Sequence, residues 1–181
     1  MTVSKINASR SRLTIKAFAG GILSSFGHNP SFTARKLNGE ISFSEDAPEQ
    51  SRLHILIDAN SLELIDDVST KDRDEIMRTM KDQVLETSQY PEITFESTEV
   101  SATKVYEGFY RATITGTLSL HGESTQEKVE ANVTVSGGNL RANGDFSIRQ
   151  TDFGIRLVSV AGGSLKVKDE LKITFEIVAQ P

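Results

Sequence analysis

The sequence predicts an all-β fold of about eight strands with one helix, and three observations carry this prediction. Most of the chain alternates apolar and polar residues with a period of two, which is typical of strands with one buried face. The period lengthens to about four only between Thr70 and Leu85. No proline occurs between Pro91 and Pro181, so the second half of the chain can pair in continuous ladders.

The clearest strand pair runs from Lys128 to Arg149 and contains Gly137-Gly138 at its centre. Two glycines suit a two-residue hairpin turn, because such a turn needs φ > 0. The resulting register places every apolar residue of the pair on one face: Val135 opposite Leu140, Val133 opposite Ala142, Ala131 opposite Gly144 and Val129 opposite Phe146.

The N-terminal half is expected to contain four shorter strands, at residues 12–18, 31–34, 37–43 and 53–59, with a brief continuation at Leu62 and Leu64. Residues 19–30 break the alternation with two glycines and an Asn-Pro pair, and are expected to form a compact turn or a single helical turn. Residues 44–50 are acidic, include Pro48, and are expected to form a loop.

Residues 70–85 predict the one substantial helix, because Ile76, Met80 and Val84 recur every four residues. Ser69 or Thr70 is its expected N-cap, and Asp72 lies in the first turn, where the helix dipole favours an acid. The mixed charges of residues 71–75 predict a solvated helix face, with the rim of a ligand entrance as the alternative.

Strands dominate the remainder of the chain. One is expected from Ile93, another from Tyr110 to Leu120, and a last one from Leu171 to Ala179. A loop at residues 102–105 is expected to join the first two, which would pair Ser97 with Tyr110, Phe95 with Ala112 and Ile93 with Ile114. A turn is expected at residues 161–164, and residues 152–160 fit no single pattern.

Composition excludes several classes of protein. The 181 residues are expected to form a single domain over 1–181, and the absence of cysteine excludes disulfides, thiolate metal sites and a cysteine nucleophile. Twenty basic against 25 acidic residues, with no basic run longer than two, exclude a nucleic-acid-binding surface. No apolar stretch approaches the ~20 residues that span a bilayer, and the polar N-terminus does not read as a signal peptide. We therefore expect a cytoplasmic protein that does not span a membrane.

No motif predicts catalysis or a metal site. His28, His54 and His121 match no metal-ligand spacing, so His54 is expected to face solvent and the other two to bond to backbone in turns. There is no Gly-x-Ser-x-Gly elbow, and Asp152-Phe153-Gly154 stands without the phosphate loop that a kinase needs. We expect a protein that is not an enzyme and needs no cofactor or metal.

Small residues share the inward face of three expected neighbouring strands: Ala112 and Gly116, Ala131, and Ala142 and Gly144. They predict a recessed wall and hence a barrel with a lumen, whereas glycines that mark bends of a coiled sheet are the alternative. The candidate residues that line a ligand in this lumen are Ile55, Ile57, Phe95, Ala112, Ile114, Ala131, Ala142, Gly144, Phe146 and Phe175.

Several motifs occur in the order seen in YceI-like proteins, and the chain resembles that family from about Leu13 to Ala179. They are Phe-Gly-His-Asn-Pro at 26–30, Arg73-Asp74, Tyr-Pro-Glu-Ile-Thr-Phe-Glu-Ser at 90–97, Gly-Thr-Leu-Ser-Leu-His-Gly at 116–122, Arg-Gln-Thr-Asp-Phe-Gly at 149–154, and residues 167–179. The resemblance implies an antiparallel eight-stranded lipocalin-like barrel with a helical insertion around residues 70–86. It also implies a polyisoprenoid or another long amphiphilic chain as the ligand in the lumen.

Two departures from the family pattern indicate a divergent branch. The usual His-Gly-Val-Thr-(Lys/Arg)-Pro run reads His-Gly-Glu-Ser-Thr-Gln from His121, and residues 76–80 replace a common His-Leu pair. The periplasmic role of members with a secretion signal is not carried over. We expect non-covalent binding of a small hydrophobic ligand, isoprenoid or fatty-acid-like. The alternative is a filled-core barrel that acts as an interaction or stress-response scaffold, and the oligomeric state is open, with a homodimer among the options.

Overall fold

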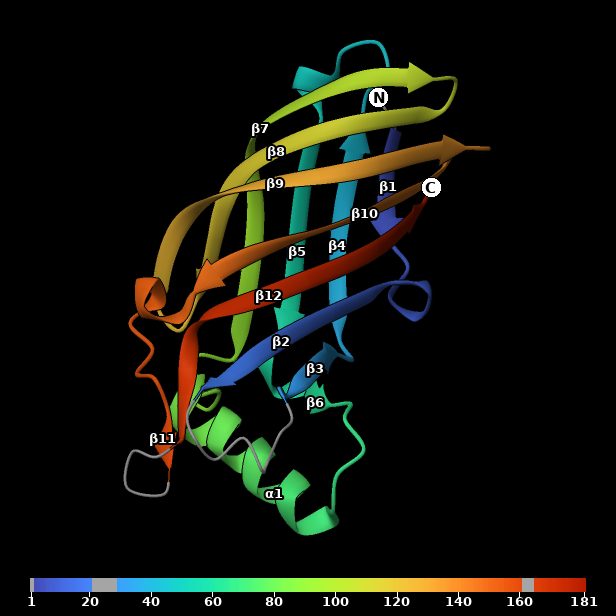
Figure 1. Cartoon of the computed structure of the whole chain (residues 1–181). Helices are drawn as coiled ribbons and strands as arrows, with labels where there is room; N and C mark the ends of the chain where they lie inside the picture. The colour runs from blue at the N-terminus through green and yellow to red at the C-terminus, as the bar shows by residue number, and fades with distance from the viewer. Residues whose placement is uncertain (1, 21–28, 161–164) are drawn as a thin grey trace.

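The computed structural model describes residues 2–20, 29–160 and 165–181, and its strands form a closed antiparallel barrel (Figure 1). The expected turns at 161–164 and over most of 19–30, and His28, lie outside the described residues. The strands are β1 (Thr2–Ile6), β2 (Arg12–Gly20), β3 (Ser31–Ala34), β4 (Leu37–Phe43), β5 (Arg52–Asp58), β6 (Leu62–Leu64), β7 (Glu92–Tyr106), β8 (Phe109–Leu120), β9 (Glu123–Ser136), β10 (Asn139–Arg149), β11 (Ser159–Val160) and β12 (Leu165–Gln180).

Three of the barrel strands are broken once along their length. A 3-10 turn at Ala8–Arg10 separates β1 from β2, residues 35–36 separate β3 from β4, and a 3-10 turn at Ala59–Ser61 separates β5 from β6. On one side of the breaks, β1 pairs with β4 and β4 pairs with β5. On the other side, β2 pairs with β3 and β3 pairs with β6, and all four pairings are antiparallel. Each broken pair is therefore one interrupted ladder, and the breaks lie side by side.

The barrel closes through its two terminal strands. β12 pairs with β10 on one side; on the other it pairs with β2 and then, at Lys5–Gln180 and Ile6–Ala179, with β1. With each broken strand counted once, eight strands meander around the barrel and every one is antiparallel to its neighbours. The predicted all-β, eight-stranded antiparallel barrel is confirmed.

The hairpin between β9 and β10 has the predicted turn, since Gly137 and Gly138 have φ of 56° and 79°. Its ladder contains the predicted pairs Val135–Leu140 and Val133–Ala142. The ladder ends at Asn132 and Asn143, so the two predicted pairs beyond it are not part of the ladder.

The predicted loop at residues 102–105 is wrong. β7 continues to Tyr106 and turns at Glu107 and Gly108, whose φ of 73° suits a tight turn. The ladder consequently pairs Phe95 with Leu118 and Ala102 with Ala112, after a bulge between Ser97 and Glu99. The tip of this hairpin is exposed on both faces, so its residues carry no apolar alternation from which the strand can be recognised.

The alternation also does not predict β1. Val3 is 54% exposed, whereas the hydroxyl-bearing Ser4 is only 7% exposed. The strand therefore inverts the usual relation between hydropathy and burial. Its position is decided by the backbone ladders to β4 and β12 rather than by an apolar face.

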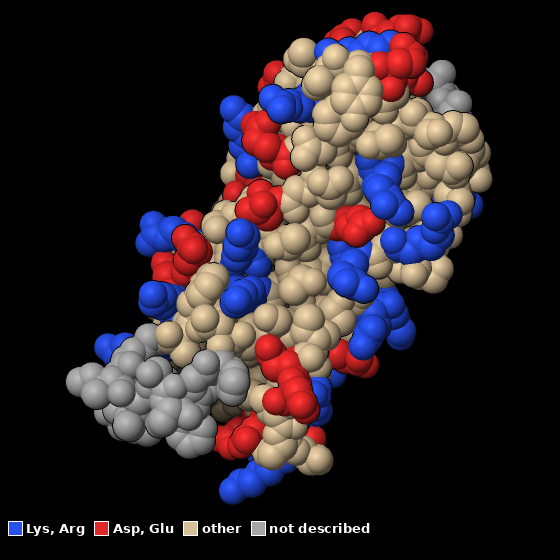
Figure 2. Space-filling view, turned by 45° about the vertical axis from the view of Figure 1, so that its right-hand side comes forward, with Lys and Arg blue, Asp and Glu red and all other residues tan. Residues whose placement is uncertain are grey.

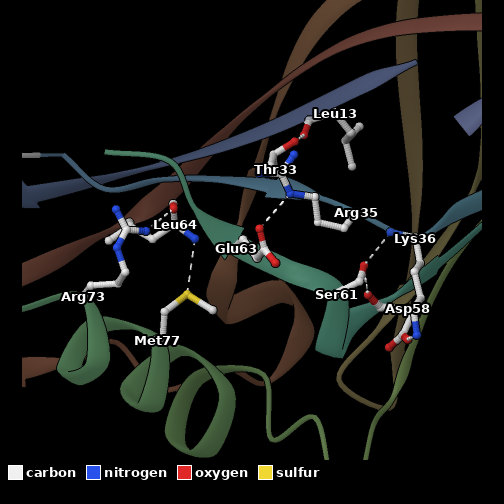
Figure 3. Close-up of polar contacts among 10 residues, drawn as sticks. All are labelled: Leu13, Thr33, Arg35, Lys36, Asp58, Ser61, Glu63, Leu64, Arg73 and Met77. Atoms are coloured by element: carbon white, nitrogen blue, oxygen red, sulfur yellow. Dashed lines mark hydrogen bonds and ion pairs between the residues drawn. The ribbon is translucent and has the colours of Figure 1, made fainter. Parts of the chain in front are cut away.

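The predicted helix is present as α1 (Thr70–Thr79), which continues as a π-helical turn at Met80–Val84. Ser69 caps it, because its Oγ accepts the Asp72 N–H at 3.1 Å. Arg73 donates to the Leu64 and Asp66 carbonyls at 2.5 and 2.7 Å. Met77 Sδ accepts the Leu64 N–H at 3.2 Å, and Figure 3 shows Arg73 and Met77 on either side of Leu64. These bonds fix α1 to β6 at one end of the barrel (Figure 1).

Side chains fill the other end of the barrel, and we call this end the filled end. Its side chains include Phe43, Tyr110, Ala112, Ala131, Val133 and Leu140. Tyr110 is 2% exposed and packs edge-on against Phe43, with ring centroids 5.2 Å apart. Its hydroxyl donates to the Glu45 carboxylate, and this hydrogen bond, together with burial, raises the pKa of Tyr110. The buried Tyr110 hydroxyl thus reaches an exposed carboxylate.

The outer face of the barrel is charged. On the face in Figure 2, Lys and Arg side chains are interspersed with Asp and Glu side chains along the strands. Cross-strand ion pairs such as Arg141–Glu176 and Lys172–Asp145 are exposed, so each contributes less than about 1 kcal/mol. Within the described ranges, every helix is too short or too polar to cross a bilayer.

Candidate functional site

A cavity of about 1030 Å³ occupies the barrel between the filled end and α1. Ligand cavities usually measure about 300–1,000 Å³, and well-packed cores contain few voids larger than a water molecule. The lining comes from β12 and every strand from β2 to β10 inside the barrel, and from α1 at its end. This volume exceeds what ordinary packing defects leave.

The cavity wall consists of apolar side chains that face inward without being fully buried. Ile55, Phe95, Ile114, Phe146 and Phe175 all line the cavity, yet each keeps an intermediate exposure. In a filled barrel, side chains of this size on the inner face would pack against one another. Their exposed surface therefore borders the cavity.

Seven of the ten residues predicted to line a lumen do lie on the cavity: Ile55, Ile57, Phe95, Ile114, Ala142, Phe146 and Phe175. The structure does not place Ala112, Ala131 and Gly144 on it. Ala112 and Ala131 belong to the filled end, where their short side chains admit the larger ones opposite. Of these small residues, only Ala142 is among the described residues that line the cavity.

Gly144 and Gly116 act through the aromatic rings beside them. A Cβ on Gly144 would lie 2.4 Å from the Glu130 carbonyl oxygen and 2.9 Å from the Phe175 ring. A Cβ on Gly116 would lie 2.5 Å from the Phe95 ring. Each glycine thus lets a phenylalanine of the adjacent strand lie across it, as aromatic rings do over glycines in sheets. Both rings in turn line the cavity.

The polar residues of the cavity were not predicted as a group. They are Asn29, Asp66, Asp72, Glu75, Thr79 and Gln150. Asn29, Asp72 and Glu75 are exposed, so the cavity reaches the surface beside α1, and we call these three residues the mouth. The alternative interpretation of the charges at residues 71–75, as the rim of an entrance, fits Asp72 and Glu75. The residues lie apart in the sequence, so only the fold brings them together.

The described histidines lie away from the cavity lining. His54 is exposed, as predicted. His121 has Nδ1 2.9 Å from the Phe153 carbonyl oxygen and Nε2 2.6 Å from Glu86, and its ring lies against Tyr90. The prediction that His121 bonds to backbone in a turn is confirmed. Its contacts join the segment after α1 to the turn between β8 and β9.

Comparison with known protein families matches residues 5–179 to the YceI-like domain. The chain belongs to the YceI-like family. It is 31% identical over 126 residues to a UPF0312 protein of Pseudomonas aeruginosa, a match that covers 66% of this chain and 60% of that protein. A UPF0312 protein of Pseudomonas syringae pv. tomato is 31% identical over 155 residues, covering 80% of this chain and 71% of the relative. This YceI-like chain thus spans about 60% of the length of the Pseudomonas aeruginosa relative.

Solved structures share the fold of this YceI-like chain. BcnA of Burkholderia cenocepacia superposes with a TM-score of 0.72 at 19% identity, over 97% of this chain and 99% of BcnA. A protein from Saccharophagus degradans described as a polyisoprenoid binding domain gives a TM-score of 0.68 at 17% identity, over 98% and 97% of the two chains. At these identities the likeness establishes the barrel.

Proposed function

We propose that this YceI-like chain binds one long hydrophobic or amphiphilic molecule, a polyisoprenoid or a fatty-acid derivative, non-covalently in its cavity. The apolar cavity of about 1030 Å³ is the observation that carries the proposal. The likeness to a polyisoprenoid binding domain supports it at the level of the family. Binding without catalysis fits a lining that is apolar except near α1.

The size of the cavity sets the scale of the ligand. If a methylene-sized group needs about the ~30 Å³ that a water molecule takes in the liquid, the cavity holds on the order of 30 such groups. Each buried five-carbon unit contributes up to ~4 kcal/mol, at about 0.8 kcal/mol per carbon, before the cost of ordering the chain. Affinity should therefore rise with chain length until the cavity is full.

The alternative of a filled-core scaffold has less support, because such a barrel would leave no cavity of this size. The cytoplasmic location and the homodimer remain predictions from the sequence. Cell fractionation and sedimentation analysis would test them.

Extraction of the purified protein with organic solvent, followed by mass spectrometry, tests the proposal directly. We expect a co-purified lipid in roughly equimolar amount, or uptake of added polyprenols by the emptied protein. Reproducible absence of both would refute ligand binding.

Two matched variants locate the binding. Ile55→Trp puts extra volume into the cavity from β5, whereas His54→Trp puts the same ring on the outer face of the same strand. We expect the first variant to lose capacity for long ligands and the second to retain it, with both still folded. Equal uptake by the two variants would place the ligand outside the barrel.

A further inference from the structure

The mouth of the cavity has a strongly one-sided charge. Asp72 and Glu75 belong to the mouth, Asp66 also lines the cavity, and no Lys, Arg or His is found among the lining residues that the structure describes. Ser31 N–H donates to Asp66 at 2.6 Å, and Ser69 Oγ donates to Asp72 at 2.7 Å, so both carboxylates are held in place. A ligand whose polar end remains at this mouth meets the carboxylates of Asp72 and Glu75, with that of Asp66 also on the cavity lining.

Positive groups lie close by, but none of them is among the described residues that line the cavity; Lys71 and Arg78 are on α1 and exposed. Arg73 donates to the carbonyls of Leu64, which Figure 3 shows beside it, and of Asp66, and it is not among the residues that line the cavity. The N-terminus of α1 carries the equivalent of about half a positive charge, and Ser69 and Asp72 already cap it. Half a charge that is already capped cannot balance three carboxylates.

A buried amide provides the second observation. Gln150 lies in the 3-10 turn Gln150–Phe153 after β10, is 3% exposed and lines the cavity. Its Nε2 donates to the Lys168 carbonyl at 2.8 Å. Because that carbonyl can only accept, the amide nitrogen must face it, and Oε1 must face away.

Gln150 Oε1 has no hydrogen-bond partner among the described residues. Every fully buried side-chain nitrogen or oxygen in that part of the chain has a partner, so Oε1 retains accessible surface although its residue is almost entirely buried. Gln150 is one of the described residues that line the cavity. Oε1 is therefore an acceptor open to the cavity, and it needs a donor.

The position of Gln150 places this acceptor on the α1 side of the barrel. Lys168 follows Val167, which pairs with Ala19, and the Ala19 N–H donates to the side chain of the mouth residue Asn29 at 3.0 Å. The open amide oxygen and the carboxylates thus belong to the same end of the cavity. Both favour a ligand group that donates hydrogen bonds.

We propose that the cavity selects an amphiphile whose head group donates a hydrogen bond and carries no negative charge, a long-chain alcohol or amine, over the corresponding phosphate or carboxylic acid. This proposal rests on the proposed function and specifies its ligand class. The apolar barrel accommodates the chain, Gln150 Oε1 accepts from the head group, and Asp66, Asp72 and Glu75 repel anions.

The test uses ligands that share one chain and differ in the head: geranylgeraniol, geranylgeranylamine and geranylgeranyl phosphate, each displacing the fluorescent probe N-phenyl-1-naphthylamine from the full-length protein. We expect the alcohol and the amine to bind about tenfold more tightly than the phosphate at low salt. The gap should narrow at high salt, because exposed carboxylates are screened. A phosphate that binds as tightly as the alcohol would overturn the proposal.

Charge variants on α1 separate the mouth from the net charge of the protein. Glu75→Lys reverses a charge on the cavity, and Asp74→Lys makes the same change at an exposed neighbour that does not line it. Phosphate binding should strengthen several-fold more in the first variant than in the second. Equal effects would show that the mouth makes no selection.

Gln150→Leu tests the acceptor. The alcohol should bind roughly fivefold more weakly, while the headless hydrocarbon phytane should bind as before. Loss of alcohol and phytane binding together would contradict a specific role for the amide. If no member of the series displaces the probe and the probe itself does not bind, the proposed function fails rather than the head-group selection.

Discussion

Gly144 lies under the Phe175 ring, which lines the cavity. Because Gly144 has no side chain, it allows both the close approach of the Glu130 backbone and the position of this ring. Replacement by alanine would place a Cβ 2.4 Å from the Glu130 carbonyl oxygen, and backbone atoms cannot move aside as a flexible side chain can. We expect Gly144→Ala to lower the free energy of unfolding by roughly 1–3 kcal/mol. Urea unfolding measures this change.

The control for this prediction is Gly137→Asn in the β9–β10 turn. A Cβ at Gly137 would meet nothing within 4 Å, and asparagine tolerates positive φ better than most residues. Its unfolding midpoint should remain near that of the wild type. A Gly144→Ala variant as stable as this control would mean that the strands can separate without cost.

Asp169 makes the stability of the protein sensitive to acid. The Thr151 N–H at 2.9 Å, the Thr151 hydroxyl at 2.7 Å and the Arg149 guanidinium hold the pKa of Asp169 below its ordinary value. A carboxylate with a depressed pKa stabilises the fold above the pKa that it has when unfolded, and this contribution is lost as the pH falls through the folded-state pKa.

Asp169→Asn should therefore reduce stability at neutral pH and flatten its decline in acid. Unfolding midpoints between about pH 7 and pH 2, a range spanning the ordinary aspartate pKa of ~3.9, would show the effect. Asp145, which is exposed and forms an ion pair with Lys172, supplies the control, since Asp145→Asn should change the pH profile of stability little. Parallel profiles for wild type and Asp169→Asn would contradict the assignment.

At the scale of elements, α1 is attached by polar bonds from Arg73 and Met77 to β6 and the residues after it, and by the packing of Ile76 and Met77 against an apolar cluster that includes Leu64. Hydrogen bonds from a charged donor contribute about 1.5–3 kcal/mol. We expect Arg73→Ala to increase amide hydrogen exchange in residues 70–84 and to speed ligand release, with little effect on β7 to β10.

Arg78 provides the comparison for this prediction, because it lies in the same helix and its side chain is exposed. Arg78→Ala should leave exchange in α1 almost unchanged. Uniform loss of protection over the whole barrel in Arg73→Ala would show instead that α1 and the barrel unfold as one unit.

The sequence predicts those elements whose burial follows their hydropathy. The Gly137-Gly138 hairpin and the Ser69-capped helix were predicted with their register or cap, because each is decided by local residue types. β1 and the tip of β7 could not be predicted in this way, since Ser4 is buried and Val105 and Tyr106 are exposed. There, pairing with distant strands overrides the local pattern.

The same division applies to the candidate site. The alternation of inward and outward side chains along a strand can be recognised from the local sequence, and it indicated residues such as Ile55 and Phe175 that line the cavity. The closure of the barrel decides which inward side chains pack together and which leave space between them, and the sequence does not show this. Ala112 and Ala131 were therefore predicted to line a lumen, whereas the structure places them in the filled end. Gln150 was not predicted, because it lies in the 3-10 turn after β10, where no strand alternation indicates which side chains face the cavity.

At the scale of the whole molecule, β1 completes the closure of the barrel that β12 and β2 begin. Removal of residues 1–6 would expose the edges of β4 and β12, which β1 joins. We expect the truncated chain to unfold at lower urea concentration, with a broader transition, and to lose ligand. The substitution Val3→Thr, on an exposed side chain of the same strand, should leave the transition unchanged. A truncated chain with wild-type stability would contradict closure by β1.

The aligned breaks in the first three strands have a consequence for how relatives of this chain can diverge. They separate the filled end, whose packing maintains the register of the barrel, from the end that carries α1 and the mouth. Substitutions beyond the breaks can change the length or head group of the cargo while the packing that supports folding stays intact. Members of the family with different cargo are therefore expected to differ mainly on the α1 side of the breaks.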